Sequence, residues 1–461
     1  MLPKGFTKTL VFSLLILCNL ILVPNHAAGN ALRTDNQETA DKNAPIVPTS
    51  TSGNEWFVSE TGTGTDCSQS GPCSLEYCVE EKADSNDTVY VRAGHYVSTD
   101  SDDNLLFIQK SLNLIGSCTW EKIGPVYCYP QNNPPSEETS YLDGENTRRV
   151  IAVEGPDIDV SIEGFYIYSG NAENRLPNPW NYPGVGGGVY ASDLDSLVLK
   201  NNYIWSNKAS SIELSTDKYS PGGGVYVEDI RELEIQENTF IFNSASARNS
   251  YGLGGGLYVT HCGETGIVDV KSNHFHENMV GDETTFSRGA GAFFIFVGNL
   301  NLDNNIFEYH NHTIRSDWID GSALYLAKDV SANSIDHNVF RLNYGNSIVT
   351  LTDLTGSLTR NSFWDNDAFY DLYIEHGDQI EIMNNFFGKT YGRAVSSTDE
   401  LSGVRGGIST IIYICSLCGD PDVDIINNSF ALAEYAIQIG DGPIVDIKRN
   451  IFSNLTKKLL M

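Results

Sequence analysis

A repeated segment constrains this chain more than any other feature. Residues 222–243, GGGVYVEDIRELEIQENTFIFN, recur in altered form from about residue 185 onward. Each copy begins with small residues, continues through an aliphatic–tyrosine–aliphatic triplet and an alternating aliphatic strand, and ends with asparagine and an aromatic strand. Three short strands without a helix, in a period of 20 to 50 residues, indicate a solenoid.

Two landmarks allow the copies to be counted. Asn-x-Phe or Asn-x-Ile marks nine copies of the repeat, at Asn202, Asn238, Asn273, Asn305, Asn338, Asn361, Asn385, Asn428 and Asn450. The preceding strands are centred on one column: Tyr190, Tyr226, Tyr258, Phe294, Tyr325, Thr350, Tyr373, Tyr413 and Gln438. The distance from column to asparagine is 11 to 15 residues, whereas the distance onward to the next column is 10 to 28.

This asymmetry predicts one rigid segment per turn and one corner with loops of variable length, because surface loops tolerate insertions and stacked strands do not. We therefore expect an all-β fold, a right-handed parallel β-helix with three-strand rungs. Each strand would pair with its copy about 4.8 Å along the axis. The asparagines are expected to stack at one turn as a ladder of side-chain hydrogen bonds that stabilises the coil.

The sequence of the N-terminal residues indicates that the protein is exported. Residues 1–31 have the layout of a signal peptide, with Lys4 and Lys8 before an apolar run and small residues near its end. An uncleaved anchor is the alternative, although the run is short for a membrane span. Residues 32–54 read as a disordered linker. We expect a β-helix over 55–461, with an N-terminal cap at 55–96 that includes a short helix after Ser74.

Charge limits the partners of the chain. It contains 59 acidic and 29 basic residues, a formal net charge of −30. Nucleic acid and anionic membranes are poor partners for such a surface. We expect no cofactor, with calcium as the one alternative, because high acidity more often serves solubility or calcium coordination outside the cell than a specific acidic site.

The cysteines suggest local disulfides. Cys67 with Cys73, Cys118 with Cys128, and Cys415 with Cys418 are close enough in sequence to pair, which leaves Cys78 and Cys262. Connectivity cannot be deduced from spacing alone.

Several strings carry a family resemblance. WFVSETGTGTDC at 56–67, NDTVYVRAGHY at 86–96 and IEGFYI at 162–167 resemble the start of secreted bacterial right-handed β-helix proteins of the pectate-lyase-like superfamily. The GGGVY and Phe-x-x-Asn words are similar to repeats of polymorphic outer-membrane proteins, the latter at 240–243, 275–278, 340–343 and 363–366. The resemblance covers about residues 55 to 455. It implies the fold but no single chemistry, because the superfamily includes lyases, hydrolases, epimerases and adhesins.

Strand alternation predicts which side chains face outward. Val225 and Val227 would line the bore, so Tyr226 would point to the other side. The predicted glycan-binding stripe contains Tyr190, Tyr226, Tyr258, Phe294, Tyr325 and Tyr373. In the related lyases this side of the coil carries the binding cleft. Alternatively, the rings stack on one another and pack beneath the loops 171–185, 208–221, 244–253 and 279–289.

No catalytic residue can be assigned from the sequence. A lyase needs a cation and a base, and a glycoside hydrolase needs converging carboxylates. Charged residues near the column are Asp193, Asp195, Asp229, Asp317, Asp320, Asp371, Glu375, Asp378, Arg175, Arg288, Arg315, Arg393 and Arg405. The histidines His261, His310, His312 and His376 show no metal-ligand spacing, so no metal site is expected.

These observations predict a secreted or cell-surface protein that binds, and could process, polysaccharide or a cell-surface glycan. The enzyme classes to consider are polysaccharide lyase and glycoside hydrolase. The alternative is an adhesin or structural solenoid without activity. We expect neither nucleic-acid binding nor membrane insertion of the mature chain. Because the sequence ends directly after an Asn-x-Phe word, truncation or a dimer through an uncapped C-terminal rung is also expected.

Overall fold

The structure is a computed structural model that describes residues 53–98, 102–121, 126–129, 136–173, 175, 182, 184–210, 219–245, 251–281, 287–310, 319–388, 390–391, 410–415, 421–440, 443–455 and 457–460. The predicted signal peptide and nearly all of the predicted linker lie outside these residues. Within them, no helix is both long and apolar enough to cross a bilayer.

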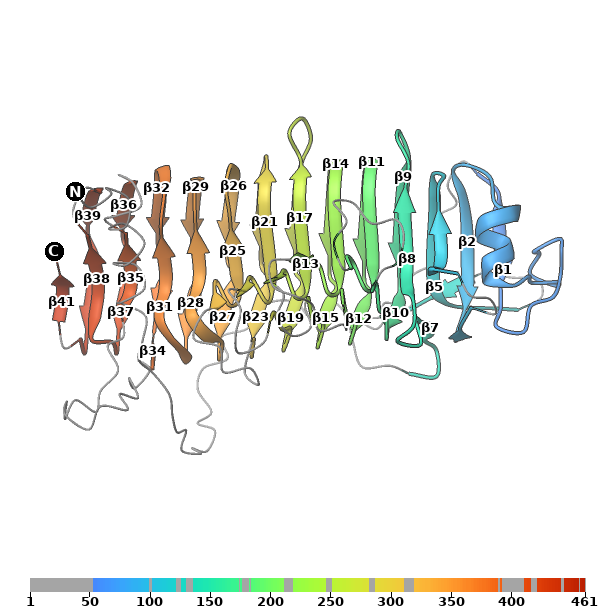
Figure 1. Cartoon of the computed structure of the whole chain (residues 1–461), viewed down its shortest axis with the longest axis horizontal. Coiled ribbons are helices and arrows are strands. Elements are labelled where there is room, and N and C mark those ends of the chain that lie inside the picture. The colour runs from blue at the N-terminus through green and yellow to red at the C-terminus, as the bar shows by residue number, and fades with distance from the viewer. Residues whose placement is uncertain are drawn as a thin grey trace, which may run out of the picture.

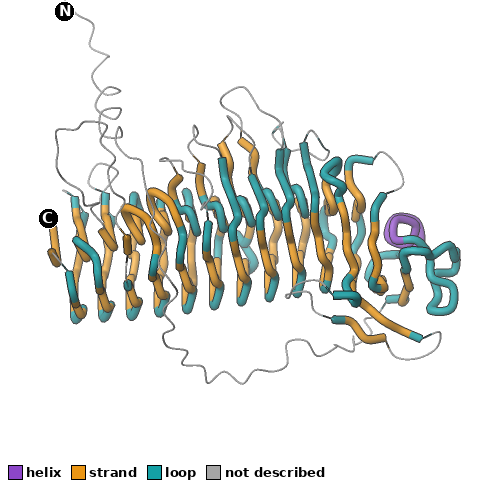
Figure 2. Tube along the Cα trace, turned by 90° about the horizontal axis from the view of Figure 1, so that it is seen from below, coloured by secondary structure: helices purple, strands orange, loops and turns teal. Residues whose placement is uncertain are grey.

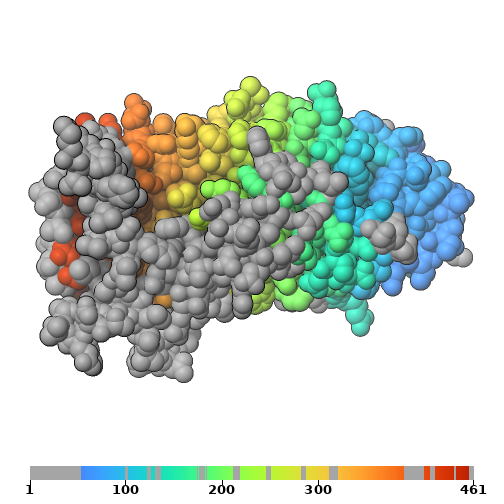
Figure 3. All heavy atoms as spheres, in the orientation of Figure 1, coloured from blue at the N-terminus to red at the C-terminus, as the bar shows by residue number. Residues whose placement is uncertain are grey.

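The chain forms a right-handed parallel β-helix, as predicted, with rungs stacked along one long axis (Figures 1 and 2). The same elongated shape is seen in space-filling form (Figure 3). A sheet of 25 strands includes two faces of the coil, and a sheet of 12 short strands forms the third. We call these the first, second and third faces, in the order in which a rung passes through them.

In each rung, the strand of the first face follows the corner with the variable loops. These strands are β4 (Asn104–Ile108), β8 (Arg149–Glu154), β11 (Val189–Lys200), β14 (Val225–Gln236), β17 (Leu257–Cys262), β21 (Ala292–Val297), β25 (Leu324–Leu326), β28 (Tyr344–Leu351), β31 (Asn366–Ile374), β35 (Thr410–Ile414), β38 (Tyr435–Ile439) and β41 (Lys457–Leu460). Strand β34 (Thr390–Tyr391) pairs with β31. The long strands β11 and β14 continue through the corner onto the second face.

The second face is formed by β1 (Glu55–Val58), β2 (Asp87–Arg92), β5 (Leu112–Trp120), β9 (Asp159–Glu163), β18 (Val268–Lys271), β22 (Leu300–Asp303), β26 (Val330–Asp336), β29 (Leu354–Thr359), β32 (Gly377–Met383), β36 (Asp422–Ile426) and β39 (Ile444–Lys448). The third face is formed by β3 (Gly94–Tyr96), β7 (Ser140–Asp143), β10 (Phe165–Tyr168), β12 (Tyr203–Trp205), β15 (Thr239–Ile241), β19 (His274–His276), β23 (Ile306–Glu308), β27 (Val339–Arg341), β30 (Ser362–Trp364), β33 (Phe386–Phe387), β37 (Ser429–Ala431) and β40 (Ile451–Ser453).

A file of phenylalanines fills the bore beside the third face. Neighbouring ring centroids lie 4.6 to 5.2 Å apart in near-parallel stacks. The file consists of Phe240, Phe275, Phe307, Phe340, Phe363, Phe387, Phe430 and Phe452. Because side chains alternate along a strand, the residues on either side of each phenylalanine point outward.

The nine predicted asparagines form one continuous ladder, so that prediction is confirmed. The Asn238 amide nitrogen donates to the Leu199 carbonyl at 2.7 Å and to Oδ1 of Asn273 at 3.2 Å. Equivalent bonds connect every rung from Asn202 to Asn450. The buried turn amides are therefore satisfied by side chains of the next rung.

A second ladder, which sequence analysis missed, lies five residues after the first, at the other end of the third-face strands. It contains Asn207, Asn243, Asn278, His310, Asn343 and Asn366. Glycines pack against it: a Cβ at Gly188 or Gly224 would approach atoms of the ladder amides to about 3 Å. Those glycines permit this close approach.

His310 interrupts the second ladder. Its Nδ1 accepts a hydrogen bond from the Asn278 backbone N–H at 3.1 Å, while its buried Nε2 has no partner among the described residues. A Cβ at Gly291 would lie 2.8 Å from Nε2, so the glycine makes room for the ring. Burial lowers the pKa of His310 to about 3.

The single described helix, η1 (Tyr77–Lys82), lies at the N-terminal end of the coil beside β1 (Glu55–Val58) and β2 (Asp87–Arg92) (Figures 1 and 2). It falls within the range in which the sequence predicts a helix, and it buries Cys78 and Val79.

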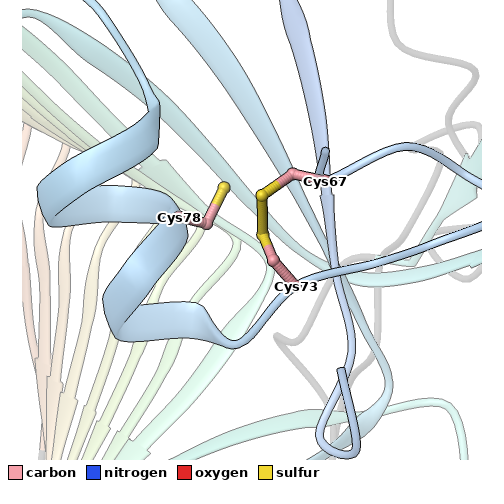
Figure 4. A group of neighbouring side chains, drawn as sticks. All are labelled: Cys67, Cys73 and Cys78. Carbon is pink, nitrogen blue, oxygen red and sulfur yellow. A yellow bond between two sulfur atoms is a disulfide. The ribbon is translucent and has the colours of Figure 1, made fainter. Parts of the chain in front are cut away.

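Two of the predicted cysteine pairs form disulfides, Cys67–Cys73 and Cys118–Cys128. The second joins β5 to β6 (Val126–Cys128). Cys78 and Cys262 are buried thiols, and Figure 4 shows Cys78 beside the first disulfide. Cys418 lies outside the described residues.

Because of the first ladder, we expect the loss of one asparagine side chain to reduce stability strongly. Asn273→Ala should lower the free energy of unfolding by roughly 3 kcal/mol, because it removes several buried side-chain hydrogen bonds and leaves their partners unsatisfied. Urea unfolding measures the change. The control is Asn301→Ala, whose half-buried amide donates to Asp269 on the second face and should cost less than about 1 kcal/mol. Equal losses would contradict a special role for the ladder.

His310 predicts a pH dependence of stability. Its folded pKa of about 3 lies below the unfolded value, so below about pH 6.5 only the unfolded state takes up the proton and stability falls as the pH decreases. His310→Asn removes the titrating group. On lowering the pH from 7 to 5, the free energy of unfolding of the variant should therefore rise by about 2 kcal/mol relative to that of the unmodified protein. Unfolding curves at both pH values test this. A constant difference would refute it.

Candidate functional site

The predicted tyrosine column exists as a continuous ring stack on the first face. Tyr190, Tyr226, Tyr258, Phe293 and Tyr325 are in register, with centroid distances of 5.2 to 5.6 Å and interplanar angles of 11° or less. These rings form a hydrophobic cluster separate from the bore. The prediction that the tyrosines point away from the bore is therefore confirmed.

The assignment of Phe294 to this column is wrong. Phe293 pairs with Tyr258, and Phe294 is fully buried in the bore. Strand β21 starts at Ala292, which pairs with Leu257 and takes the first bore position. A shift of one residue exchanges the two faces of a strand, so Ile295 also lies outside the bore.

The ring stack is covered rather than open. A small parallel sheet of β13 (Tyr219–Pro221), β16 (Tyr251–Leu253), β20 (Ser287–Arg288) and β24 (Ile319–Asp320) follows the variable loops. Val185 and Leu253 pack on the rings, whose residues are 1 to 8% exposed from Tyr190 to Tyr325. The alternative that the rings stack on one another and pack beneath the loop corner is the one observed.

Arginines lie at both ends of this stack. The Arg149 guanidinium lies 4.9 Å from the ring centroid of Tyr190, and that of Arg288 lies 5.0 Å from Tyr325. Arg149 is fully buried and donates to the carbonyls of Val185 and Gly186. Both arginines extend the stack by cation–π contacts, but only Arg149 is buried with it, since Arg288 is exposed.

Tyr373 lies beyond Thr350, which interrupts the stack. It is half-buried and packs on Tyr370 and Tyr413, with centroid distances of 5.6 and 5.4 Å. Tyr373 is therefore the predicted binding residue with the greatest access to solvent.

Two of the predicted carboxylates lie near this end of the stack. Burial raises the pKa of both Asp320 and Glu375, Asp320 raises that of Glu375 further, and Arg288 opposes both shifts. Burial of a carboxyl group favours its protonated form. Asp195 instead pairs with Arg231, and Arg175 with Asp103.

The remaining predicted charges are dispersed. Asp193 and Asp229 occupy corner positions with positive φ, Asp371 is fully buried, and Asp378 is exposed. Asp317, Arg315, Arg393, Arg405 and His312 lie outside the described residues.

A different aromatic group lies on the outer side of the third face, near the N-terminal end. We define the aromatic surface as Tyr141, Tyr166, Tyr168, Tyr203 and Trp205. Strands β7, β10 and β12 position these rings on either side of the bore residues Leu142, Ile167 and Ile204. All are partly exposed except Tyr166, which is 7% exposed and forms the base.

The rings of the aromatic surface do not form a single parallel stack. Tyr166 stacks on Tyr203 at 4.7 Å, but Tyr141 and Tyr168 are inclined to Tyr166 by 53° and 66°. Trp205 lies 5.9 Å from Tyr168 at 34°. Four of the five residues remain partly exposed, so part of this uneven surface is open to solvent.

Polar groups border this surface. The Tyr168 hydroxyl donates to Oδ2 of Asp143 at 2.8 Å, and Nε2 of His95 lies 2.8 Å from the same hydroxyl. Burial and the Asp143 hydrogen bond raise the pKa of Tyr168. A hollow of about 590 Å³ adjoins these groups, lined in part by His95, Tyr141 and Glu137. The site thus combines apolar ring faces with hydrogen-bonding groups.

Sequence analysis missed this surface because it followed the tyrosines of the first face. The available signal was the pair of aromatic residues around the bore residue in YIY at 166–168 and YIW at 203–205. By strand alternation, both members of each pair face outward together.

Because the ring stack is buried, we expect the truncation of one of its tyrosines to reduce stability. Tyr226→Ala should lower the free energy of unfolding by roughly 3–5 kcal/mol, because it creates a cavity between two stacked rings. Thermal or urea unfolding gives the value. Tyr127→Ala, at a 40% exposed tyrosine, is the control and should change stability by less than about 0.5 kcal/mol. A neutral effect of Tyr226→Ala would show that the stack is open.

Comparison with known proteins gives one result at the level of fold. Residues 148–307 match the family model described as right-handed beta helix region. No curated protein and no solved structure matches the chain. The matched segment includes β8 to β23, with the start of the asparagine ladder and most of the buried ring stack. The match and the stacked parallel rungs identify the chain as a right-handed parallel β-helix protein.

Proposed function

We propose that this is an extracellular protein that binds an extended neutral polysaccharide on the aromatic surface of the third face. The observation that carries the proposal is the cluster of five aromatic residues on the outer side of the coil. Four of them are partly exposed, and a hollow lined in part by His95 and Glu137 lies beside them.

Aromatic rings suit sugars for a physical reason. A pyranose ring has C–H faces that are apolar and carry a slight positive charge, which favours contact with the negative face of an aromatic ring. Its hydroxyls need polar partners at the edge of that contact. Asp143, His95 and the Tyr168 hydroxyl provide such partners beside the rings.

The charge around the site favours neutral sugars over uronates. Glu137 lines the hollow, Asp143 lies among the rings, and the Glu60 carboxylate accepts a hydrogen bond from the His95 backbone N–H. The whole chain has a net charge of −30. A polyanionic chain would be repelled by these carboxylates, whereas a neutral chain would not.

The shape of the third face favours an extended ligand. Its short strands run across the coil, so equivalent outward positions follow one another along the axis at about 4.8 Å. The aromatic surface spans β7, β10 and β12 in that direction, and His95 on β3 continues it. A polymer lying along the axis could contact several rings at once.

Extracellular localisation is part of the proposal. Its support is the signal-peptide layout of residues 1–31 and the two disulfides at the N-terminal end of the coil.

Binding of the full chain to a panel of glycans tests the proposal. The panel includes neutral cellulose, xylan, mannan and galactan, together with acidic polygalacturonate and alginate. We expect binding to at least one neutral glycan, and Trp205→Ala should weaken it about tenfold, equivalent to about 1.4 kcal/mol. Calorimetry or affinity electrophoresis measures the change.

The matched control is Tyr219→Ala, at a 44% exposed tyrosine on β13, which should leave affinity unchanged. Preference for the acidic glycans would contradict the charge argument. Neutral-glycan binding that survives combined Trp205→Ala and Tyr141→Ala substitution would exclude the aromatic surface. No binding to any glycan would favour the adhesin or structural alternative.

A further inference from the structure

Two histidines and a glutamate meet on the third face outside the aromatic surface. His274 and His276 are two residues apart on β19, so both side chains lie on the same face. Glu308 is opposite His276 on the neighbouring strand β23. Its Oε1 lies 2.8 Å from Nε2 of His274 and 3.1 Å from Nδ1 of His276.

We propose that His274, His276 and Glu308 bind a divalent first-row transition-metal ion, with zinc as the reference ion. The three ligand atoms all lie within 4.8 Å of one another. Zinc binds nitrogen and carboxylate oxygen at about 2.0–2.2 Å, so ligand atoms around a tetrahedral ion are about 3.3 Å apart. Small side-chain adjustments from the observed separations would produce that geometry.

The carboxylate is already held in position by its neighbours, since both histidines and Arg341 lie within hydrogen-bond distance of it. Arg341 pairs with Oε2, which leaves Oε1 directed at the two imidazoles. Outer partners of this kind orient metal-binding carboxylates.

The histidines suit the same role. Glu277 lies 3.6 Å from Nε2 of His276, on the opposite side of the ring from the proposed ligand atom Nδ1. The side chains of His274 and His276 are 38% and 24% exposed, whereas that of Glu308 is 7% exposed. Solvent can therefore reach the histidine side of the site, where a water or a substrate atom could provide a fourth ligand.

An ion pair alone does not explain this arrangement. Arg341 already neutralises Glu308, yet two further imidazoles converge on one oxygen of the same carboxylate. Nitrogen ligands also favour zinc, copper, nickel or cobalt over calcium, which requires six to eight oxygens. This proposal departs from the sequence-based expectation of no metal site, which considered other histidines and could not place Glu308 beside β19.

The proposed centre shares its face with the aromatic surface. The outward positions of His274 and Trp205 belong to strands separated only by β15, so the two sites are about 10 Å apart along the axis. A ligand on the aromatic surface could therefore extend to the metal. Metal binding itself does not depend on the proposed glycan binding.

Metal titration of the full chain tests the proposal. After treatment with a chelator and its removal, calorimetry with Zn²⁺ should show one site that is weakened at least tenfold by His276→Ala and by Glu308→Gln. Co²⁺ should give visible absorption bands of a four- or five-coordinate site, without the near-ultraviolet thiolate band that cysteine ligands would produce.

The matched control is His337→Ala, which removes a histidine that pairs with Asp336 on the second face and should leave affinity unchanged. Circular dichroism and thermal unfolding confirm that each variant is folded. Absence of binding by the folded protein, or binding that changes less than twofold in the double variant His274→Ala/His276→Ala, would overturn the proposal. Loss of glycan binding in Trp205→Ala with metal binding intact would separate the two sites.

Discussion

The hydrogen bonding between stacked rungs is the interaction on which the rest of this structure depends. Backbone pairing runs along all three faces, and two files of side chains reinforce it at the ends of the third-face strands. In the first ladder, each buried asparagine donates to a main-chain carbonyl and to the next asparagine, so a register error would leave several buried polar groups unpaired. The ladders therefore fix the register of the third face rung by rung.

That constraint decides what the third face can present to solvent. Between Asn202 and Asn207, one residue enters the bore and its two neighbours point outward. The same spacing at Asn273 and Asn278 places Phe275 inside and exposes both histidines of β19. Two outward files result, and their members on successive strands become close neighbours although they are far apart in sequence, as are His276 and Glu308.

The strands of the first face stack in the same way, but their outward residues are covered. Its tyrosines form an outward file, yet the loop corner returns as a small parallel sheet and covers them. Burial of the five stacked rings and of Arg149 makes this region a second core. Aromatic residues in a repeat therefore do not by themselves mark a binding surface, because stacking in a core and stacking on a ligand select the same side chains.

The sequence by itself determined the repeat, the three-strand rung, the asparagine ladder and the outward direction of Tyr226, because each follows from period and alternation within one copy. It could not determine the position of Phe294, where a one-residue offset in β21 exchanges inside and outside. Only the tertiary structure decided that the tyrosine stack is covered, that Tyr168 meets His95 and Asp143, and that Glu308 meets His274 and His276. The physical reason is that these contacts join residues of different rungs or of a returning loop. Which of these residues meet depends on the length and path of the loops that connect the rungs.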